Sequence, residues 1–319
     1  MRGIDQLVRE LKRRGYGERL CCNEPLAQYT TFGIGGPADL LLVAERLEEL
    51  QEWVRLAREV RVPVLVLGKG SNVLVADAGV RGLVIINRCQ EFELAESGLL
   101  LAQGGVLLNE LAWWTVKRGW AGLEWAVGIP GTVGGAVVGN AGAYGGCIGD
   151  VVRWALVLSP EGREERWSNE QLAFDYRTSA LKHFSSKGER WIVLQVALQL
   201  TRGEREKLEA RARNVLQQRR ERTPQGYCAG SVFKRTVQYP AGFLIEQAGL
   251  KGYRIGGAEV SRKHANFFMN IGGATANEMR ALMEVVSRKV WETFGQRLEP
   301  EIEFIGEWED HLDQKREEE

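Results

Sequence analysis

Glycine is dense between residues 122 and 149, in GLEWAVGIPGTVGGAVVGNAGAYGGCIG, which carries no charge after Glu124. Glycine loses more conformational entropy on folding than other residues and weakens helix and strand interiors. We therefore expect tight turns whose bare backbone N–H groups line a surface. A polyanionic cofactor is the natural occupant of such a surface. A membrane span and a flexible linker are the alternatives, but Pro130 and Asn140 suit a span poorly, and Ile129 and Val133 are too apolar for a linker.

A second glycine turn, Gly68-Lys69-Gly70-Ser71-Asn72, follows the apolar run 62–67 and precedes Val73-Leu74-Val75. A dinucleotide-binding GxGxxG is disfavoured because Val73 takes the place of the third glycine and the residues after it are β-like. A strand–turn–strand remains, which offers backbone N–H groups, the Ser71 hydroxyl and the Asn72 amide to phosphate oxygens. A hairpin turn with polar residues is the open alternative.

These turns need strands and helices to hold them, and the periodicity predicts an α+β chain. Apolar spacing indicates a helix near residues 47–57, a short helix near 108–114, and strands at 62–67, 99–103 and 154–158. A strongly charged helix follows Gly203, with Leu208, Ala212, Val215 and Leu216 on one face. We expect its basic end, Arg219, Arg220 and Arg222, to be solvated.

The last predicted helix begins at a capping box, Thr275-Ala276-Asn277-Glu278, and stops at Gly295. From Glu307 on, the chain is expected to form a charged, frayed tail.

Composition restricts the partners. The 42 Lys and Arg residues balance 42 Asp and Glu residues, so no global field recruits nucleic acid or an acidic membrane, and a small-molecule partner is favoured. The N-terminal segment is a charged amphipathic helix without an uncharged signal core, which predicts a cytoplasmic protein. Five cysteines without CxxC spacing predict reduced, packed thiols, and three scattered histidines predict no metal site.

Several segments resemble the UDP-N-acetylenolpyruvoylglucosamine reductase family, a flavoenzyme family of bacterial cell-wall precursor synthesis. They are, in order, TTFGIGGPADLLL, LGKGSN, GLEWAVGIPGTVGGAVVGNAGAYG, FDYRTSALK, AGSVFKR, LIEQAGLKGYRIGGAEVSRKHANFFMN and LEPEIEFIG. Each is weak alone, but together they span nearly the whole chain in register.

The resemblance implies a vanillyl-alcohol-oxidase-type FAD-binding fold of two α+β subdomains, residues 1–85 and 86–202. A C-terminal α+β substrate-binding domain at 203–298 and a final segment at 299–319 would follow. FAD is expected to be non-covalent, since no His or Cys stands in the GIGG stretch. The residues expected along FAD are Gly68, Lys69, Gly70, Ser71, Asn72, Gly128, Ile129, Pro130, Gly131, Thr132, Gly135 and Ala136.

The resemblance also implies a catalytic trio. Arg177 would stabilise the charge that develops beside the substrate carboxylate, Ser231 would act as general acid, and Glu301 would orient or polarise the reacting end. From the residues alone, Arg177 could instead form an ion pair with Asp175, and Ser231 could be an ordinary turn residue. Glu299 is a rival of Glu301 by spacing.

Substrate contacts are expected from Tyr176, Lys234, Arg235 and His264. The family usually continues the serine motif as Phe-Lys-Asn-Pro, whereas this chain has Phe233-Lys234-Arg235-Thr236. An amide contact to the substrate is thereby replaced or lost, and Arg235 could pair with a phosphate instead. A lone histidine such as His264 is more often structural.

The expected activity is FAD-dependent, NADPH-consuming reduction of a UDP-sugar enolpyruvyl ether to UDP-N-acetylmuramate by a monomer. Two other classes stay open. One is an FAD oxidase or dehydrogenase of a sugar or hydroxy acid, which would pass electrons to oxygen or a dye. The other is a non-catalytic nucleotide-binding protein, in which Arg177, Ser231 and Glu301 are structural.

Overall fold

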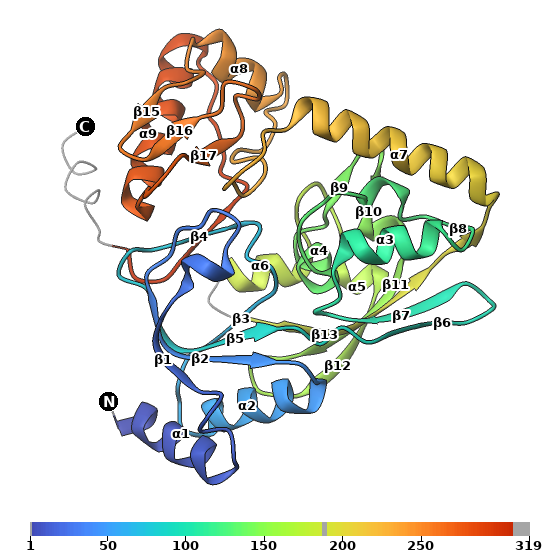
Figure 1. Ribbon diagram of the computed structural model, residues 1–319, viewed down its shortest axis with the longest axis vertical. Helices are drawn as coiled ribbons and strands as arrows, with labels where there is room; N and C mark the ends of the chain where they lie inside the picture. The colour runs from blue at the N-terminus through green and yellow to red at the C-terminus, as the bar shows by residue number, and fades with distance from the viewer. Residues whose placement is uncertain (1, 187–189, 309–319) are drawn as a thin grey trace. The chain divides into compact units, whose positions relative to one another are not determined.

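The computed structural model describes residues 2–186 and 190–308, and the predicted charged tail lies largely outside them (Figure 1). The chain forms two compact units. Unit 1 comprises Met1–Cys21, Leu41–Ser71 and Gly82–Pro224, and unit 2 comprises Cys22–Leu40, Asn72–Arg81 and Gln225–Glu319. The functional subdivision at residues 85, 202 and 298 stays a prediction.

Unit 1 carries most of the helices and the largest sheet. Its elements are α1 (Arg2–Arg13), α2 (Leu47–Glu59), β3 (Val64–Leu67), β6 (Phe92–Leu94), β7 (Leu99–Gln103), α3 (Leu108–Val116), β8 (Trp120–Ala121), the 3-10 turn η2 (Glu124–Ala126), α4 (Val133–Val138), β9 (Gly142–Ala143), β10 (Gly146–Cys147), η3 (Ile148–Asp150), β11 (Val152–Leu158), β12 (Glu164–Ser168), α5 (Asn169–Leu172), α6 (Ala180–Ser186), β13 (Ile192–Gln199), β14 (Thr201–Arg202) and α7 (Arg205–Arg222).

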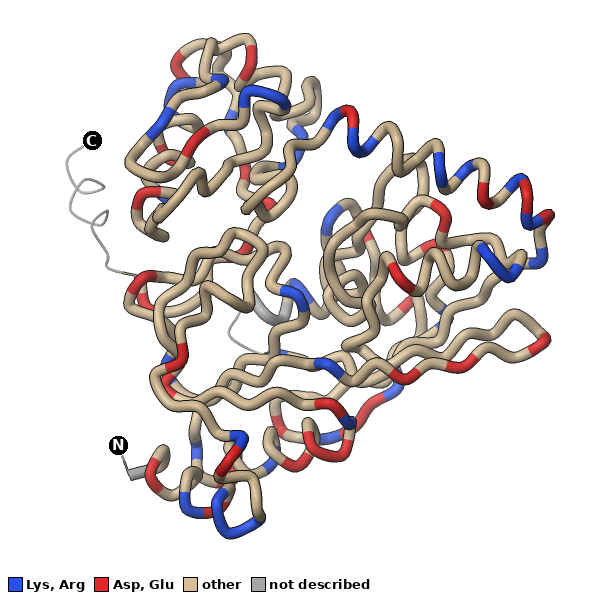
Figure 2. Tube along the Cα trace, in the orientation of Figure 1, with Lys and Arg blue, Asp and Glu red and all other residues tan. Residues whose placement is uncertain are grey.

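The main sheet of unit 1 has the antiparallel order β12-β11-β13-β7-β6. Its buried side chains join those of α3, α4 and α7 in one core, which includes Leu111, Val137, Val196 and Val215. Helix α7 packs on α3 and η2, and Figure 2 shows charges of both signs along it. Its predicted apolar face is confirmed, because Leu208, Ala212 and Val215 are buried.

A second sheet has the order β1-β2-β5-β3, where β1 is Cys21–Pro25, β2 is Pro37–Ala44 and β5 is Val80–Asn87. Strand β3 pairs in parallel with β5, from Val64 opposite Leu83 to Leu67 opposite Ile86. Helix α2 packs on β3 and on α1. The strand predicted before Gly68 is therefore confirmed. The glycine turn at 68–72 begins where β3 ends.

Unit 2 has its own core, formed around one long helix and a small sheet. The remaining elements are η1 (Leu26–Tyr29), β4 (Val73–Val75), α8 (Ala241–Gln247), β15 (Arg254–Ile255), β16 (Ala258–Val260), β17 (Phe268–Asn270), α9 (Ala276–Phe294) and β18 (Glu303–Ile305). Strands β15, β16 and β17 form an antiparallel sheet on which α9 packs, and β18 pairs in parallel with β4. The buried face of α9 contributes Met279, Leu282 and Val286 to this core.

Both predicted ends of α9 are confirmed. The Thr275 hydroxyl accepts from the Glu278 N–H at 3.1 Å, and the Glu278 carboxylate accepts from the Thr275 N–H at 3.1 Å. Asp77 adds a second acceptor, taking the N–H groups of Ala276 and Asn277 at 2.7 and 2.9 Å. Gly295 ends the helix at a φ of 63°, which favours glycine.

The cysteines are free thiols, as expected, but the prediction that they are packed is wrong for two of them. Cys89 is buried, whereas Cys21 and Cys22 are exposed on the edge strand β1. Burial raises the pKa of the Cys89 thiol to about 12, so this thiol is unreactive at neutral pH. Among the described residues, no helix combines the length and apolar character needed to cross a membrane.

Candidate functional site

The two glycine turns of unit 1, predicted separately, lie against each other. A Cβ at Gly68 would stand 2.4 Å from the Thr132 hydroxyl oxygen, so only glycine fits there. The Ser71 hydroxyl donates to the Pro130 carbonyl at 3.1 Å, and a Cβ at Gly131 would meet the same hydroxyl at 3.1 Å. Lys69 is exposed beside this contact. The turns at 68–71 and 128–132 therefore form one backbone-lined surface.

The glycine segment is not made of turns alone. Residues Val133–Val138 form the short helix α4, which corrects the expectation that so many glycines exclude a helix. The Thr132 hydroxyl caps α4 by accepting from the Gly135 N–H at 3.3 Å. Close packing explains one glycine, because a Cβ at Gly134 would stand 2.9 Å from the Gly104 carbonyl oxygen. Gly135 is exposed and Ala136 is buried.

Gly128, at the start of the second turn, is held from two sides. Its φ is 75°, its N–H donates to the Asn109 side-chain oxygen, and a Cβ there would meet Leu216 and Arg219 of α7 at 3.0 Å each. Glycine is thus required both for the backbone conformation and for the approach of α7. Ile129 and Pro130 continue the turn, half-buried and exposed respectively.

The expectation that the basic end of α7 is solvated is wrong for Arg219. Arg220 and Arg222 are exposed, but the Arg219 Nε is buried and has no hydrogen-bond partner among the described residues. The Arg219 guanidinium carbon lies 5.9 Å from the centre of the Tyr144 ring. Burial, with the nearby Arg177 charge, lowers the pKa of Arg219, and only the Tyr144 interaction opposes this. Arg177 and Arg219 therefore place two positive charges in one part of unit 1.

Tyr144 reaches its position through a tight hairpin. Strands β9 and β10 pair Ala143 with Gly146, so Tyr144 and Gly145 form a two-residue loop. Both have positive φ, 50° and 83°, as a type I′ turn requires. The Tyr144 conformation is therefore fixed by the turn and carries its ring toward the α7 end.

Arg177 also stands in a tight turn. Asp175 and Thr178 exchange backbone hydrogen bonds of 3.1 and 3.2 Å, which leaves Tyr176 and Arg177 as the two loop residues. Arg177 has a φ of 56°, which disfavours residues with a side chain, and a structural constraint must maintain it. The Asp175 carboxylate accepts from the Tyr176 N–H at 2.6 Å. Tyr176 is half-exposed.

Two hydrogen bonds fasten this turn to the chain after α4. The buried Asn140 amide donates to the Asp175 carbonyl at 2.8 Å and accepts from the Gly149 N–H at 3.1 Å. The Ser179 hydroxyl donates to the Val138 carbonyl at 2.7 Å. Asn140 itself has a φ of 42° just past the helix end, a position that Asn tolerates. The glycine segment thus positions the backbone that carries Arg177.

In unit 2, Ser231 lies on an extended segment held between two others. It forms a β-bridge with Phe267, and Val232 donates its N–H to the Asn266 carbonyl at 2.9 Å. The buried Asn266 side chain accepts from the Phe233 N–H at 3.0 Å and donates to the Phe233 carbonyl at 2.8 Å. Asn266 therefore acts like one more residue of a paired strand.

Glu301 lies directly across from this segment. Its N–H donates to the Val232 carbonyl at 2.8 Å, and Pro300 forms a β-bridge with Phe233. The Asn72 amide donates to the Glu301 carbonyl at 3.2 Å, and the Asn72 carbonyl accepts from Glu303 at 2.9 Å. Asn72 thus belongs to unit 2 and supports the Glu301 backbone, whereas Gly68, Lys69, Gly70 and Ser71 belong to unit 1.

Lys234 and Glu299 form an ion pair through Nζ and Oε1, and their backbones are joined by a 2.8 Å hydrogen bond. The carboxylate that rivalled Glu301 by spacing is therefore committed to Lys234. Arg235 is exposed. The His264 ring packs edge-on against Phe267, its Nδ1 accepts from the Asn266 N–H at 3.2 Å, and burial lowers its pKa. His264 thus supports the Asn266 clamp through its side chain.

Comparisons with known proteins agree with this geometry. Residues 38–168 match the FAD binding domain family, and residues 222–305 match the UDP-N-acetylenolpyruvoylglucosamine reductase, C-terminal domain family. A UDP-N-acetylenolpyruvoylglucosamine reductase of Lachnoclostridium phytofermentans is 40% identical over 312 residues, covering 94% of this chain and 97% of that protein. The chain belongs to the UDP-N-acetylenolpyruvoylglucosamine reductase family.

Further members are similarly close. The reductase of Rubrobacter xylanophilus is 46% identical over 286 residues, covering 89% of this chain and 95% of its own. The crystal structure of the Thermus caldophilus reductase superposes with a TM-score of 0.75 at 36% identity, covering 90% of this chain and 98% of that one. The predicted fold and the prediction of FAD as cofactor are confirmed by membership of this family.

The residues present fit an anionic, planar cofactor. The glycine surface at 68–71 and 128–132 has backbone that a ligand can approach closely, and Arg219 places a positive charge beside Gly128 at the start of the second of these turns. Among the described residues, no cluster of His, Cys, Asp or Glu could hold a metal ion.

Sequence reasoning missed Arg219, Asn140 and Asn266. Arg219 was detectable, since it lies three and four residues after Leu216 and Val215 and so shares the buried helix face. Asn140 and Asn266 give no such signal, because both act through contacts with segments distant in sequence.

Proposed function

We propose that this protein catalyses the reduction of UDP-N-acetylglucosamine enolpyruvate to UDP-N-acetylmuramate. The observation that carries this proposal is its near full-length similarity to UDP-N-acetylenolpyruvoylglucosamine reductases, with each segment of the motif set present in order. The pairing of the Ser231 and Glu301 segments in unit 2 supports it. FAD, reduced by NADPH, would supply a hydride to the terminal carbon of the enolpyruvyl ether.

Residues of the chain would stabilise the negative charge that hydride addition creates and would supply the proton that completes the reduction. Hydride addition leaves negative charge on the carbon beside the carboxylate, and a fixed guanidinium such as Arg177 stabilises it. Ser231 would donate a proton to that carbon. A serine hydroxyl is a weak acid, so the nearby Glu301 segment and the developing charge must make it competent. Glu301 would orient or polarise the reacting end.

Substrate binding would use further residues of each unit. Tyr176 is half-exposed beside Arg177, and Lys234 follows Ser231 on the same extended segment. The Lys234 ammonium is paired with the exposed Glu299. An exposed ion pair is weak, so Lys234 can exchange that carboxylate for a diphosphate oxygen at little cost. Arg235 would replace the amide that the family usually carries there, and His264 would hold the segment behind Ser231.

The test is a pair of half-reactions. The purified protein should be yellow, NADPH should bleach its flavin under anaerobic conditions, and the enolpyruvyl UDP-sugar should restore the colour with formation of UDP-N-acetylmuramate. A reduced protein that this substrate does not reoxidise would refute the proposal. Rapid peroxide formation with a carbohydrate would support an oxidase, and protein that cannot bind FAD would support a non-catalytic role.

Ser231→Ala separates catalysis from positioning. We expect normal flavin reduction by NADPH and reoxidation by substrate slowed by about 10²- to 10⁴-fold, the usual contribution of a general acid. Equal slowing of both half-reactions would identify Ser231 as a positioning residue. Thr236→Ala removes a hydroxyl from a nearby turn and serves as the control, because among the described residues that hydroxyl bonds to the Tyr239 backbone alone.

We also propose a cytoplasmic monomer. The balanced charge, which gives no overall field that would recruit nucleic acid or an acidic membrane, supports this assignment. Size-exclusion chromatography with light scattering would check the monomer, and fractionation of the source cells would check the location.

A further inference from the structure

Arg219 is a half-buried cation that forms no ion pair with a carboxylate among the described residues. Its Nε is inaccessible to solvent and makes no hydrogen bond among residues 2–186 and 190–308. Neighbouring charged residues of α7 behave differently: Arg213 pairs with Glu209 at 2.6 Å, and Arg211 lies 3.7 Å from the buried Glu124. A buried polar group without a partner destabilises the fold, and more so when it is charged.

The surroundings of Arg219 make this arrangement more costly, not less. Arg177 is close enough to disfavour the charged form of Arg219, and the group that favours it is the neutral ring and hydroxyl of Tyr144. Negative charge beside Arg219 would offset this effect and favour its charged form. No described carboxylate lies against Arg219, and a bound anionic ligand would supply the negative charge that the fold does not.

The position of Arg219 beside the glycine turn indicates which ligand it would contact. Its Cδ lies 3.0 Å from where a Gly128 Cβ would stand, so its side chain runs along the first residue of the glycine turn. That turn, with residues 68–71, forms the backbone-lined surface expected along FAD. The Asn109 side chain fixes Gly128 from the other side, so the contact with Arg219 is built on a fixed backbone.

We propose that Arg219 places a permanent positive charge at bound FAD, where it stabilises the negative charge that the isoalloxazine acquires on two-electron reduction. The hydride donor transfers two electrons and one proton, so the reduced ring carries one net negative charge unless it takes a second proton from solvent. A fixed cation favours the anionic reduced form and raises the midpoint potential. The inference rests on FAD binding and deepens the proposed function, since it does not depend on which electron acceptor follows.

The experiment measures the midpoint potential of the full-length, FAD-loaded protein against a reference dye. Arg219→Met keeps the aliphatic stem and removes the charge, whereas Arg219→Lys keeps the charge. We expect Arg219→Met to lower the equilibrium constant for flavin reduction ten- to a hundredfold, which is about 30–60 mV for a two-electron couple. Arg219→Lys should recover most of this change. Arg220→Met, an exposed neighbour on the same helix, should leave the potential unchanged.

Three results would overturn the assignment. An Arg219→Met protein with full FAD content and unchanged potential would do so directly. Loss of FAD from Arg219→Met but not from Arg219→Lys would assign the charge to the cofactor's phosphates instead. An unchanged potential with a raised KM for the UDP-sugar would assign it to substrate. Failure of reoxidation by the enolpyruvyl substrate would leave the potential measurable, so it would refute the proposed function without deciding on Arg219.

Discussion

Two charged side chains of unit 1, one buried and one half-buried, are treated in opposite ways. Glu49, on α2, is 4% exposed and surrounded by donors, whereas Arg219, on α7, has a buried Nε without any hydrogen bond in the described chain. Folding must satisfy buried charges or accept a large penalty. We therefore assign Glu49 a structural role, and Arg219 the role of binding a ligand that we propose above.

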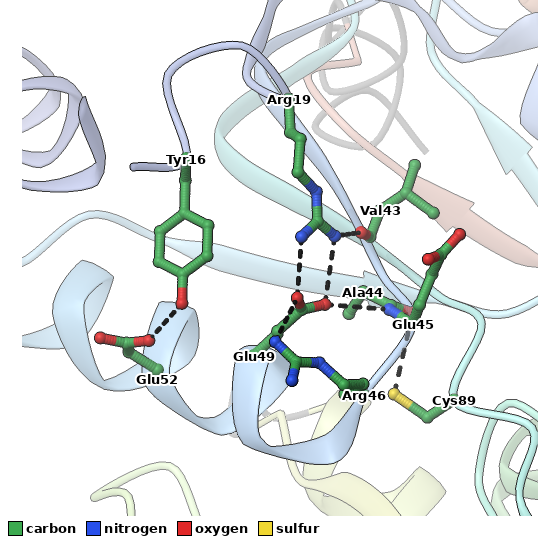
Figure 3. A network of polar contacts seen from close by, with 9 residues as sticks. All are labelled: Tyr16, Arg19, Val43, Ala44, Glu45, Arg46, Glu49, Glu52 and Cys89. Atoms are coloured by element: carbon green, nitrogen blue, oxygen red, sulfur yellow. Dashed lines mark hydrogen bonds and ion pairs between the residues drawn. The ribbon is translucent and has the colours of Figure 1, made fainter. Parts of the chain in front are cut away.

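Figure 3 shows how completely Glu49 is satisfied. Arg19 donates to both carboxylate oxygens at 2.7 and 3.1 Å, Arg46 donates at 3.1 Å, and the Glu45 N–H donates at 3.3 Å. The Arg19 Nη2 that donates to Glu49 also donates to the Val43 carbonyl at 2.7 Å, so Arg19 links α2 to the end of β2. The hydrogen bonds from Arg19 are the largest cause that lowers the pKa of Glu49, to about 2, against the opposing effect of burial.

The contrast teaches a way to separate structural from functional charge. Removing a partner from the Glu49 network should cost stability and leave the chemistry intact. Removing a charge at the glycine surface should cost chemistry and leave stability intact or improved. The predictions below test this division from the largest effect to the smallest.

Arg177→Met should give the largest effect. Loss of a preorganised cation near developing charge typically costs about 3 kcal/mol, so reoxidation of the reduced flavin by substrate should slow by about 10²- to 10³-fold. The loss of stability should be much smaller than the loss of rate, because methionine keeps an unbranched apolar stem and the φ of 56° with its strain stays the same. Stopped-flow absorbance and thermal unfolding would check the two statements.

The matched control is Arg163→Met, which removes an exposed arginine from a surface pair with Glu161. It should alter neither the half-reactions nor the unfolding temperature by more than the scatter of surface substitutions. A loss of stability in Arg177→Met as large as its loss of rate would place Arg177 with the structural charges and break the division.

Glu49→Gln should show the reverse pattern. It leaves Arg19 and Arg46 facing a neutral amide, and we expect a loss of roughly 2–3 kcal/mol of unfolding free energy at pH 7, with both half-reactions unchanged. Urea unfolding of the FAD-loaded protein would measure the first and stopped-flow the second. Altered flavin reduction in this variant would contradict the assignment of Glu49 to architecture.

The pH dependence of this difference has a definite sign. Glu49 has a folded pKa of about 2, below its ordinary value of 4.5, so its stabilisation is present above pH 4.5 and is lost as the pH falls toward 2. The difference in unfolding free energy between the wild type and Glu49→Gln should therefore shrink over that window. A difference that stays constant from pH 5 to pH 3 would mean that the carboxylate gains nothing from Arg19 and Arg46.

The same contrast explains what the sequence could predict. Glycine spacing located both turns, and the capping box located α9, because these signals depend on neighbours in the chain. The basic composition of the end of α7 led to the wrong prediction that Arg219 is solvated. Its spacing from Val215 and Leu216 places it on the buried face of the helix. For long charged helices, periodicity is therefore a better guide than the count of basic residues.

Long-range support for the site left no pattern in the sequence. Asn140 bonds Asp175 35 residues away, Asn266 bonds Phe233 33 residues away, and Asn72 bonds Glu301 229 residues away. Each is a single amide whose partner is a backbone group, so no side chain of matching type marks the other end. The resemblance to a family supplied Ser231 and Glu301, but the hydrogen bonds that hold their segments became evident only from the fold.

Asn140→Ala should show that Arg177 acts from a fixed backbone. The change removes the 2.8 Å bond to Asp175 and leaves the Gly149 N–H without its acceptor. We expect reoxidation by substrate to slow by about tenfold, since a loss of about 1.4 kcal/mol of positioning corresponds to that factor. Flavin reduction by NADPH should remain within twofold, and stability should fall by about 1–2 kcal/mol.

Asn169→Ala is the matched control for Asn140. Its amide donates to the carbonyls of Gly149 and Val152 at 2.9 and 2.8 Å. Asn169 therefore supports the segment around Gly149, as Asn140 does, but forms no bond with the Asp175–Thr178 turn in these contacts. It should lose similar stability and keep the reoxidation rate. If the two variants lose the same rate, Asn140 is merely structural and does not position Arg177.

The smallest effect expected is a gain of stability. In protein stripped of FAD, Arg219→Met should raise the unfolding free energy by about 1 kcal/mol, because it removes a buried, unpaired donor while its methylene and thioether groups keep the contact with Gly128 and Leu216. Added FAD should stabilise the wild type more than the variant, since only the wild type gains an anion for its cation. Thermal unfolding with and without FAD would measure both, with Arg220→Met as the reference.

A variant less stable than wild type without FAD would mean that the arginine is already satisfied by the fold, and the distinction between the Glu49 and Arg219 regions would fail.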